Sequence, residues 1–353
     1  MIRNLPQIAR VVQRNCDVSD ARHAGEYGLC TFLLKMREYY RWENELPFTH
    51  RLPGDDLGEW LKSREQLWSR LESEDFAPLP LEGGGECDPF DADAANDELL
   101  AQGCVYGAGY GRFHKPMFFL GRLLRVEERA GLTIRVSSCE YARELTAPPA
   151  MLQGRTIYVR QESVRRFLWE RVEEWQWSKR DNAMARALAE YDFIGDTEAA
   201  LARMADNEME SMILHEIGEA MAGEALGSAW GELALSVAAT PAEPVARAVR
   251  DLLADCLSTL PQLIARRNTR ALHFHFATFD APRRQLFPEA LRAYGHFLRS
   301  GELAPLSEAV LEGSRHWLAT ARGLLALEAG SREGALKALL ARSGAGGPEG
   351  RGS

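Results

Sequence analysis

The sequence predicts an α+β fold that is predominantly α-helical, and three observations support this prediction. Residues before 75 and after 160 repeat apolar side chains at helical spacing, whereas residues 103–160 alternate and are rich in β-branched and aromatic residues. A stretch rich in Gly, Pro and Asp lies between the first helical part and the alternating part. We expect a helical body with a small antiparallel β-sheet of three or four strands near residues 103–160.

These changes of pattern divide the chain into five expected segments. The boundaries between them follow from changes in composition, because the sequence contains no internal repeat. The segments are an N-terminal helical segment (1–75), a linker (76–97), a small β-sheet region (98–160), a helical body with the candidate site (161–330), and a C-terminal helix end with a disordered tail (331–353).

Apolar periodicity and the positions of Gly and Pro set the expected bounds of the elements. Asp20 is the expected N-cap of the second helix. The segment EERAG predicts a hairpin turn between strands at 122–126 and 132–136, and RTIYVR predicts a further strand at 155–160. The expected helices cover 3–14, 20–43, 55–74, 161–192, 196–226, 243–267, 287–299 and 303–329.

The composition narrows the class of protein. Hydrophobic residues make up 46% and charged residues 26% of the 353 residues, which is typical of a globular chain with a sizeable core. The net charge of −9 disfavours a surface that binds nucleic acid by neutralising phosphates. We therefore expect no nucleic-acid partner, and a small-molecule or peptide substrate of a kind that the sequence does not specify.

The cysteines and the N-terminal residues bear on the compartment. None of the six cysteines forms a C-x-x-C pair, so we interpret them as reduced thiols. The first twenty residues contain no continuous apolar core of a signal peptide, and no uncharged apolar run approaches the roughly 20 residues that cross a bilayer. The expected location is cytoplasmic, with no membrane partner.

The stretch ESMILHEIGEAMAGEALG carries the main functional signal. At 3.6 residues per turn, Glu208, His215 and Glu219 fall on one stripe of the expected helix 196–226. Side chains one turn apart on one helix face can hold a metal ion together. An imidazole with carboxylates suits Zn, Fe or Mn and does not choose among them. The pattern predicts a divalent-metal cofactor.

Glu216 follows His215 directly and projects about 100° away around the helix. In H-E-x-x-H enzymes this offset lets the glutamate act as general base while its neighbours hold the metal. The run HEIGE resembles the zincin helix over about a dozen residues, with Glu219 in place of the second histidine. Because the departure falls on a ligand, protease activity is not carried over; Glu216 is the expected catalytic base.

Further donors are expected from other elements. Asp251 and Asp255 share a face of the expected helix 243–267, which can pack antiparallel to the His215 helix. Among the histidines of ALHFHFATFD, we expect His273 to complete the shell, although so aromatic a stretch is more often core. His275 lies two residues further on and would share its face only in a strand.

Three functional hypotheses follow. The first is a metal-dependent enzyme of hydrolytic type with a His/carboxylate site on two adjacent helices. The second is a non-haem iron or di-iron redox protein in which Glu208 supplies an extra carboxylate. The third is a non-catalytic regulatory or scaffold protein in which the same residues form a polar seam or a solvated face, with ion pairs such as Arg247–Asp251.

Four segments carry a resemblance that extends over most of the chain. They are CDVSDARHAGEYGLCTFLLKMREYYRWE, HEIGEA, VRDLLADCLSTLP and LHFHFATFDAPRRQLFP. Together they are similar to an uncharacterised family of soluble proteobacterial proteins. The resemblance implies no activity, cofactor or catalytic residue.

Overall fold

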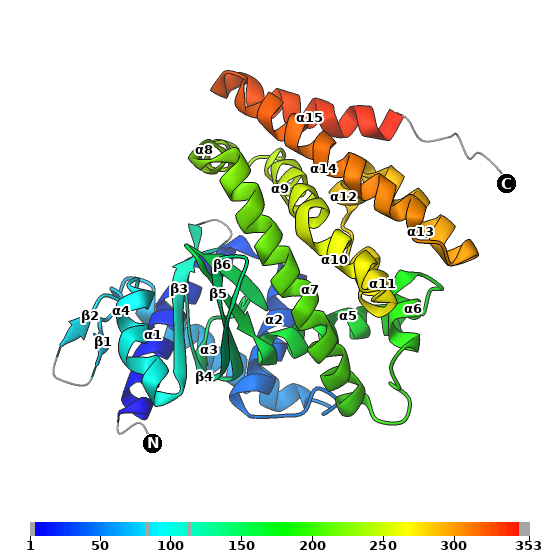
Figure 1. Ribbon diagram of the computed structural model, residues 1–353. Helices are drawn as coiled ribbons and strands as arrows, with labels where there is room; N and C mark the ends of the chain where they lie inside the picture. The colour runs from blue at the N-terminus through cyan, green and yellow to red at the C-terminus, as the bar shows by residue number, and fades with distance from the viewer. Residues whose placement is uncertain (1–3, 82–84, 112–113, 346–353) are drawn as a thin grey trace. The chain divides into compact units, whose positions relative to one another are not determined.

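The computed structural model describes residues 4–81, 85–111 and 114–345. The chain forms two compact units: unit 1 comprises Met1–Glu174 and Tyr191–Met209, and unit 2 comprises Trp175–Glu190 and Glu210–Ser353. Figure 1 labels most of the helices and strands of both units. The predicted class is confirmed, because the described residues are mostly helical and carry a compact sheet in one part of the chain.

Unit 1 contains a five-stranded sheet in the order β3-β4-β5-β7-β6. The prediction of three or four antiparallel strands needs correction, because β5 and β7 pair in parallel while the other neighbours are antiparallel. The strand β6 forms a short hairpin with β7 through Gly154, which has a positive φ of 56°. The strands are β3 (Cys104–Tyr110), β4 (Pro116–Arg129), β5 (Leu132–Arg143), β6 (Ala150–Gln153) and β7 (Thr156–Arg160).

The hairpin predicted at EERAG joins β4 to β5. Arg129 pairs with Leu132, and the two residues between them, Ala130 and Gly131, have φ values of 52° and 71°. Two positive φ values in a two-residue loop match the right-handed twist of the flanking strands. Both strands extend beyond the predicted bounds, and the added part of β4 includes the buried Phe118 and Leu120.

The N-terminal helix α1 (Leu5–His23) is continuous, so the predicted break near residues 14–20 is wrong. Asp20 is not an N-cap; it is buried within α1, where it pairs with Lys115 and accepts a hydrogen bond from the Leu145 N–H at 2.8 Å. The helix continues because its buried face packs on β4 and β5, as Figure 1 shows, with the Cys16 thiol donating to the Phe118 carbonyl at 3.1 Å.

Further helices complete unit 1. Residues 76–97, assigned to a linker from composition, contain β1 (Leu79–Pro80), β2 (Glu86–Cys87) and most of α4, with Leu79 and Ala95 fully buried. The Asp91 carboxylate caps α4 by accepting from the Ala94 N–H at 3.0 Å. The helices are α2 (Leu29–Glu43), α3 (Gly54–Leu71), α4 (Ala92–Leu99) and α5 (Gln161–Ser178), together with the first part of α7 (Thr197–Leu226).

The described part of unit 2 is helical and has one large apolar core that includes Leu214, Val249, Leu253 and Trp317. Figure 1 shows α14 beside α13 and α15 in this unit. The elements are α6 (Ala183–Ala189), α7 from Glu210 onward, α8 (Ser228–Ser236), α9 (Glu243–Ala254), the π-helical turn η4 (Asp255–Thr259), α10 (Leu260–Ala265), α11 (Thr269–Ala277), α12 (Ala281–Leu286), α13 (Pro288–Ser300), α14 (Ala304–Leu325) and α15 (Ala329–Ala345).

Three predicted helices are each divided in the structure. The range 20–43 holds the end of α1 and all of α2, and the range 161–192 holds α5 and α6, whereas the range 303–329 corresponds to α14. The range 243–267 is interrupted by η4, because Pro261 has no N–H to donate to the preceding turn. In the tail predicted from composition, α15 continues to Ala345, and residues 346–353 lie outside the described part.

Two further observations concern the whole described chain. All six cysteines are free thiols. Within residues 4–81, 85–111 and 114–345, no helix combines the length and apolar character that crossing a membrane requires.

Candidate functional site

The centre of unit 2 is a close approach of α7 to the end of α9. A side chain larger than hydrogen does not fit at Gly218 of α7, since a Cβ there would lie 2.3 Å from the carbonyl oxygen of Ala254. Glycine therefore lets the two helix backbones meet. This contact brings His215 and Glu219, on either side of Gly218, next to Asp251 and Asp255.

Three side chains converge at this contact. One ligand-type atom each of His215, Glu219 and Asp251 lies within 4.8 Å of the other two, and all three side chains are half-buried. His215 Nε2 is 3.9 Å from Glu219 Oε1. Donor atoms of a tetrahedral zinc ion stand roughly 3.3 Å apart, so small rotations of these side chains would bring them to a shared ion.

Asp255 orients the imidazole of His215. Its Oδ1 lies 2.9 Å from His215 Nδ1, and Asp255 is only 1% exposed. The Nδ1 atom is thereby engaged, and Nε2 is the nitrogen on the side of Glu219. A metal-binding histidine commonly donates its other N–H to a carboxylate in this way, which holds the ring in position and makes the ligand nitrogen more basic.

The π-helical turn has a direct consequence for Asp255. Asp251 and Asp255 stand four residues apart, and the wider turn begins at Asp255. Insertions of this kind re-aim side chains and occur often at functional sites. Here Asp255 contacts His215 Nδ1, whereas Asp251 converges with His215 and Glu219.

The electrostatics favour a cation at the centre. Although burial opposes the charged imidazole, the carboxylates of Asp255, Asp251 and Glu219 raise the pKa of His215 to about 10. Burial and the neighbouring carboxylates raise the pKa of Asp251 to about 6, although His215 lowers it. Several acidic groups therefore share one site, and the His215 imidazolium is one of the positive charges that balance them.

Three further basic residues surround this centre. Arg250 pairs with Glu219 at 2.7 Å, and Arg283 Nη1 lies 3.5 Å from Asp255 Oδ2. His275 Nε2 lies 3.8 Å from the same Asp255 oxygen. Burial, together with Arg283 and His215, lowers the pKa of His275 to about 4, so this histidine is neutral at pH 7. Together with the four residues described above, these three form what we call the His215 cluster: His215, Glu219, Arg250, Asp251, Asp255, His275 and Arg283.

His273 does not join the cluster, although the sequence favours it over His275. Its Nδ1 lies 2.8 Å from the hydroxyl of Tyr294, and its ring packs against Tyr294 and Phe297. Residues 269–277 form a helix, in which side chains two residues apart point about 200° apart. Of these two histidines, His275 is the one that approaches Asp255. A helical pattern in ALHFHFA could have indicated that the two side chains diverge, but not which of them faces Asp255.

The other predicted site residues lie on α7. Glu208 belongs to unit 1, is buried, and accepts a hydrogen bond from Asn207 at 2.9 Å; it is not a member of the triad. Glu216 is half-buried and precedes the close contact at Gly218 by two residues. Arg250 and Arg283 had no distinguishing signal in the sequence, because arginines are frequent along the whole chain.

Comparison with known families identifies the group to which the chain belongs. Residues 7–160 match the N-terminal domain, and residues 165–343 the C-terminal domain, of a family of unknown function (DUF6866). The chain therefore belongs to this family, and the predicted resemblance to an uncharacterised family is confirmed. No curated protein and no solved structure matches the chain.

Proposed function

We propose that this protein is a metal-dependent enzyme of hydrolytic type, with a single divalent ion held by His215, Glu219 and Asp251. The observation that supports it most is the combination of the converging triad with the Asp255 contact at His215 Nδ1. A solvated helix face requires no buried carboxylate behind its histidine, whereas a metal ligand commonly has one.

The donor set suits this chemistry. One imidazole nitrogen and two carboxylates are typical ligands of Zn, Mn and Fe(II), and three protein ligands leave room for water and substrate. When bound, such an ion polarises a carbonyl or phosphoryl oxygen and makes water more acidic. Glu219 binds through Oε1, because its Oε2 is paired with Arg250.

Glu216 is the proposed general base. It lies next to His215 in the chain, and its offset of about 100° around α7 separates it from the ligand stripe. We expect Glu216→Gln to keep metal binding and to lower the rate of hydrolysis by about 10²–10⁴-fold. Loss of metal binding in this variant would instead assign Glu216 to the shell of ligands.

Metal analysis of protein purified without an affinity tag tests the proposal. We expect about one ion per chain by mass spectrometry, and a higher melting temperature with Zn, Mn or Fe(II) added after chelation. The variants His215→Ala and Asp251→Asn should lose both effects. A wild-type protein that contains no metal and gains no stability from any of these ions would contradict the proposal.

Activity measurements separate the two kinds of chemistry that the same ligands could support. Ester and phosphoester hydrolysis that requires Zn or Mn would favour the hydrolytic interpretation. An iron-specific signal with oxygen consumption would favour a mononuclear non-haem iron protein instead. The described triad supplies one histidine and two carboxylates, so a di-iron centre is not proposed.

A non-catalytic regulatory or scaffold role is the second candidate, and one observation favours it. The ion pairs of Glu219 with Arg250 and of Asp255 with Arg283 balance the cluster without any metal. In that case the cluster joins helices of unit 2. Asp251→Asn distinguishes the two roles, since it should abolish metal-induced stabilisation if an ion binds and change nothing else if the cluster is structural.

A further inference from the structure

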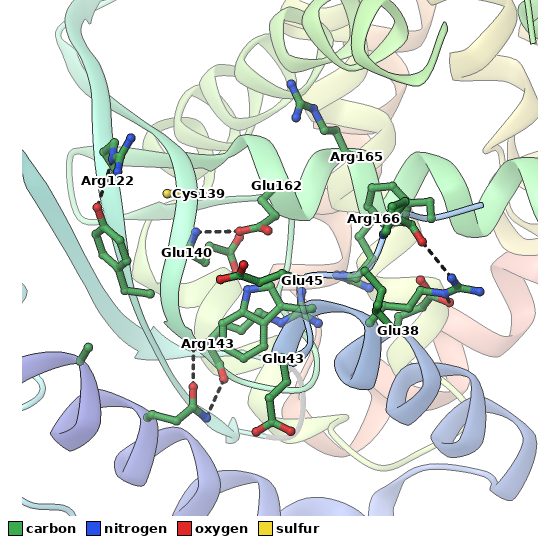
Figure 2. A pocket seen from close by; sticks show the side chains of 18 of the residues that line it. Glu38, Glu43, Glu45, Arg122, Cys139, Glu140, Arg143, Glu162, Arg165 and Arg166 are labelled. Atoms are coloured by element: carbon green, nitrogen blue, oxygen red, sulfur yellow. Dashed lines mark hydrogen bonds and ion pairs between the residues drawn. The ribbon is translucent and has the colours of Figure 1, made fainter. Parts of the chain in front are cut away.

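Unit 1 contains a cavity of about 950 Å³ whose described lining residues all belong to that unit. Its volume falls in the range typical of sites for small molecules. Figure 2 shows side chains from three elements around it: α2 and the loop that follows (Glu38, Glu43, Glu45), β5 (Cys139, Glu140, Arg143) and α5 (Glu162, Arg165, Arg166). We call it the Arg143 cavity.

Arg143 is the unusual residue of this lining. It is 1% exposed, and its Nε and Nη2 have no hydrogen-bond partner among the described residues. These two nitrogens form one edge of the guanidinium group, and their N–H bonds point the same way. That edge is the one that binds both oxygens of a carboxylate or phosphate side by side.

The surrounding residues hold Arg143 in place without using this edge. Its backbone N–H donates to Gln13 Oε1 at 3.1 Å, and its carbonyl accepts from Gln13 Nε2 at 3.2 Å. The guanidinium carbon lies 5.4 Å from the ring centre of Tyr39 and 5.1 Å from that of Trp42. The donors are therefore positioned before any ligand arrives, which lowers the entropy cost of binding.

Two nearby buried glutamates are already engaged by an arginine. Arg160 binds both oxygens of Glu140, at 3.2 and 2.7 Å, and also binds Glu144 at 2.9 Å. Ser163 donates a further hydrogen bond to Glu140 at 2.6 Å. Burial and the guanidinium groups of Arg166 and Arg160 lower the pKa of Arg143, although Glu140 raises it.

We propose that the Arg143 cavity binds a small organic carboxylate, whose two oxygens accept hydrogen bonds from Nε and Nη2 of Arg143. A buried cation without a hydrogen-bonded anion is costly, and a ligand carboxylate supplies that anion. The site lies wholly in unit 1 and does not depend on the ion proposed for unit 2.

Two features of the lining favour a carboxylate over a phosphate. The described lining contains six arginines and six glutamates, so the formal charge is balanced and a dianion would meet repulsion. Trp42, Phe48 and Tyr141 also line the cavity and suit a ligand with an apolar body. Phenylacetate is a suitable probe, and phenylacetamide has the same shape without the charge.

Isothermal titration calorimetry of the full chain with phenylacetate, phenylacetamide and inorganic phosphate tests the proposal. We expect phenylacetate to bind at least tenfold more tightly than either of the others. Arg143→Met should weaken phenylacetate binding by about 10–100-fold. Arg143→Lys should also weaken it, because an ammonium group does not offer two parallel donors.

Arg122→Gln is the matched control, since Arg122 lines the same cavity but its Nε donates to Tyr141. We expect less than a threefold change in this variant. Three results would each overturn the proposal. They are an equal loss of phenylacetate affinity in Arg122→Gln and Arg143→Met, binding of phenylacetamide as tight as that of phenylacetate, and binding of phosphate tighter than that of phenylacetate. If an Arg143 variant does not fold, a crystal structure of the wild type soaked with phenylacetate decides, because the carboxylate must lie on the Nε–Nη2 edge.

Discussion

The His215 cluster in unit 2 and the Arg143 cavity in unit 1 are both rich in charge, but their charges are arranged in opposite ways. In the His215 cluster, acidic groups gather around one histidine, and burial together with the neighbouring carboxylates raises the pKa of Asp251 to about 6. In the Arg143 cavity, the lining residue Glu140 is engaged by Arg160, and Arg143 keeps one edge without a hydrogen-bond partner.

This difference teaches that the number of charged residues does not determine what a site binds. Buried charges that have partners hold the fold together, and a buried charge in surplus shows which sign of ligand would relieve it. In the His215 cluster the carboxylates of Glu219, Asp251 and Asp255 gather at one histidine, which suits a cation. The Arg143 cavity has a surplus guanidinium edge, which suits an anion. This distinction can be tested with two kinds of substitution: one removes a charge that has a partner, and the other removes a charge that has none.

The largest contrast within unit 2 should lie between Asp255 and Asp251. Asp255→Asn removes the carboxylate that contacts His215 and Arg283, and we expect it to lower the free energy of unfolding by about 3–5 kcal/mol. Asp251→Asn should change it by less than about 1 kcal/mol without metal, because the raised pKa shows that the ionised form is disfavoured. Urea unfolding at pH 7 measures both. Equal effects would show that the two aspartates do not differ as proposed.

The same contrast applies in unit 1 to Arg160 and Arg143, which are both 1% exposed. Arg160→Met leaves Glu140 and Glu144 buried without their main partner, and we expect a loss of about 3–5 kcal/mol. Arg143→Met removes a charge that has no such partner. We expect it to lower the free energy of unfolding by no more than about 1 kcal/mol, a value that includes the lost contacts with Tyr39 and Trp42. Chemical denaturation measures the free energy of unfolding of both variants. If Arg143→Met were as unstable as Arg160→Met, the claim that Arg143 carries a charge without a partner would be refuted.

Stability should also depend on pH through His215. Its folded-state pKa of about 10 lies above the ordinary value of 6.5, so its contribution is complete below pH 6.5 and is lost as the pH rises toward 10. Between these limits we expect wild type to lose on the order of 2–4 kcal/mol more than His215→Gln. Urea midpoints of both proteins at pH 6.5 and 10 give the difference. Parallel pH profiles would mean that His215 carries no such contribution.

The smallest expected effects concern the helix contact that assembles the cluster. Gly218→Ala places a Cβ against the Ala254 carbonyl and should cost about 1–3 kcal/mol, because the helices must move apart. Gly223→Ala is the control on the same helix: no atom lies within 4 Å of the added Cβ, so helix propensity should stabilise the protein by about 0.5–1 kcal/mol. Thermal unfolding of the two variants should shift in opposite directions, and shifts of the same sign would contradict the close contact.

The fold class could be predicted from local patterns, and the errors have identifiable causes. The hairpin at Ala130–Gly131 followed from turn chemistry between alternating residues. The break predicted before Asp20 failed because Asp20 is a polar residue that is paired inside the fold with Lys115, rather than a cap. The parallel pairing of β5 with β7 could not be predicted, because it joins strands separated by another strand in the sequence.

The sequence by itself determined which side chains on α7 share a stripe, because the helical repeat places His215 and Glu219 one turn apart. It also indicated that Asp251 and Asp255 were the donors to consider. Only the tertiary structure decided that Asp255 orients His215 while Asp251 joins Glu219, that His275 rather than His273 approaches Asp255, and that Arg143 has an unpartnered edge. The physical reason is that a helical stripe is a local property of the backbone, whereas the partner of a buried charge depends on which distant segments pack against it.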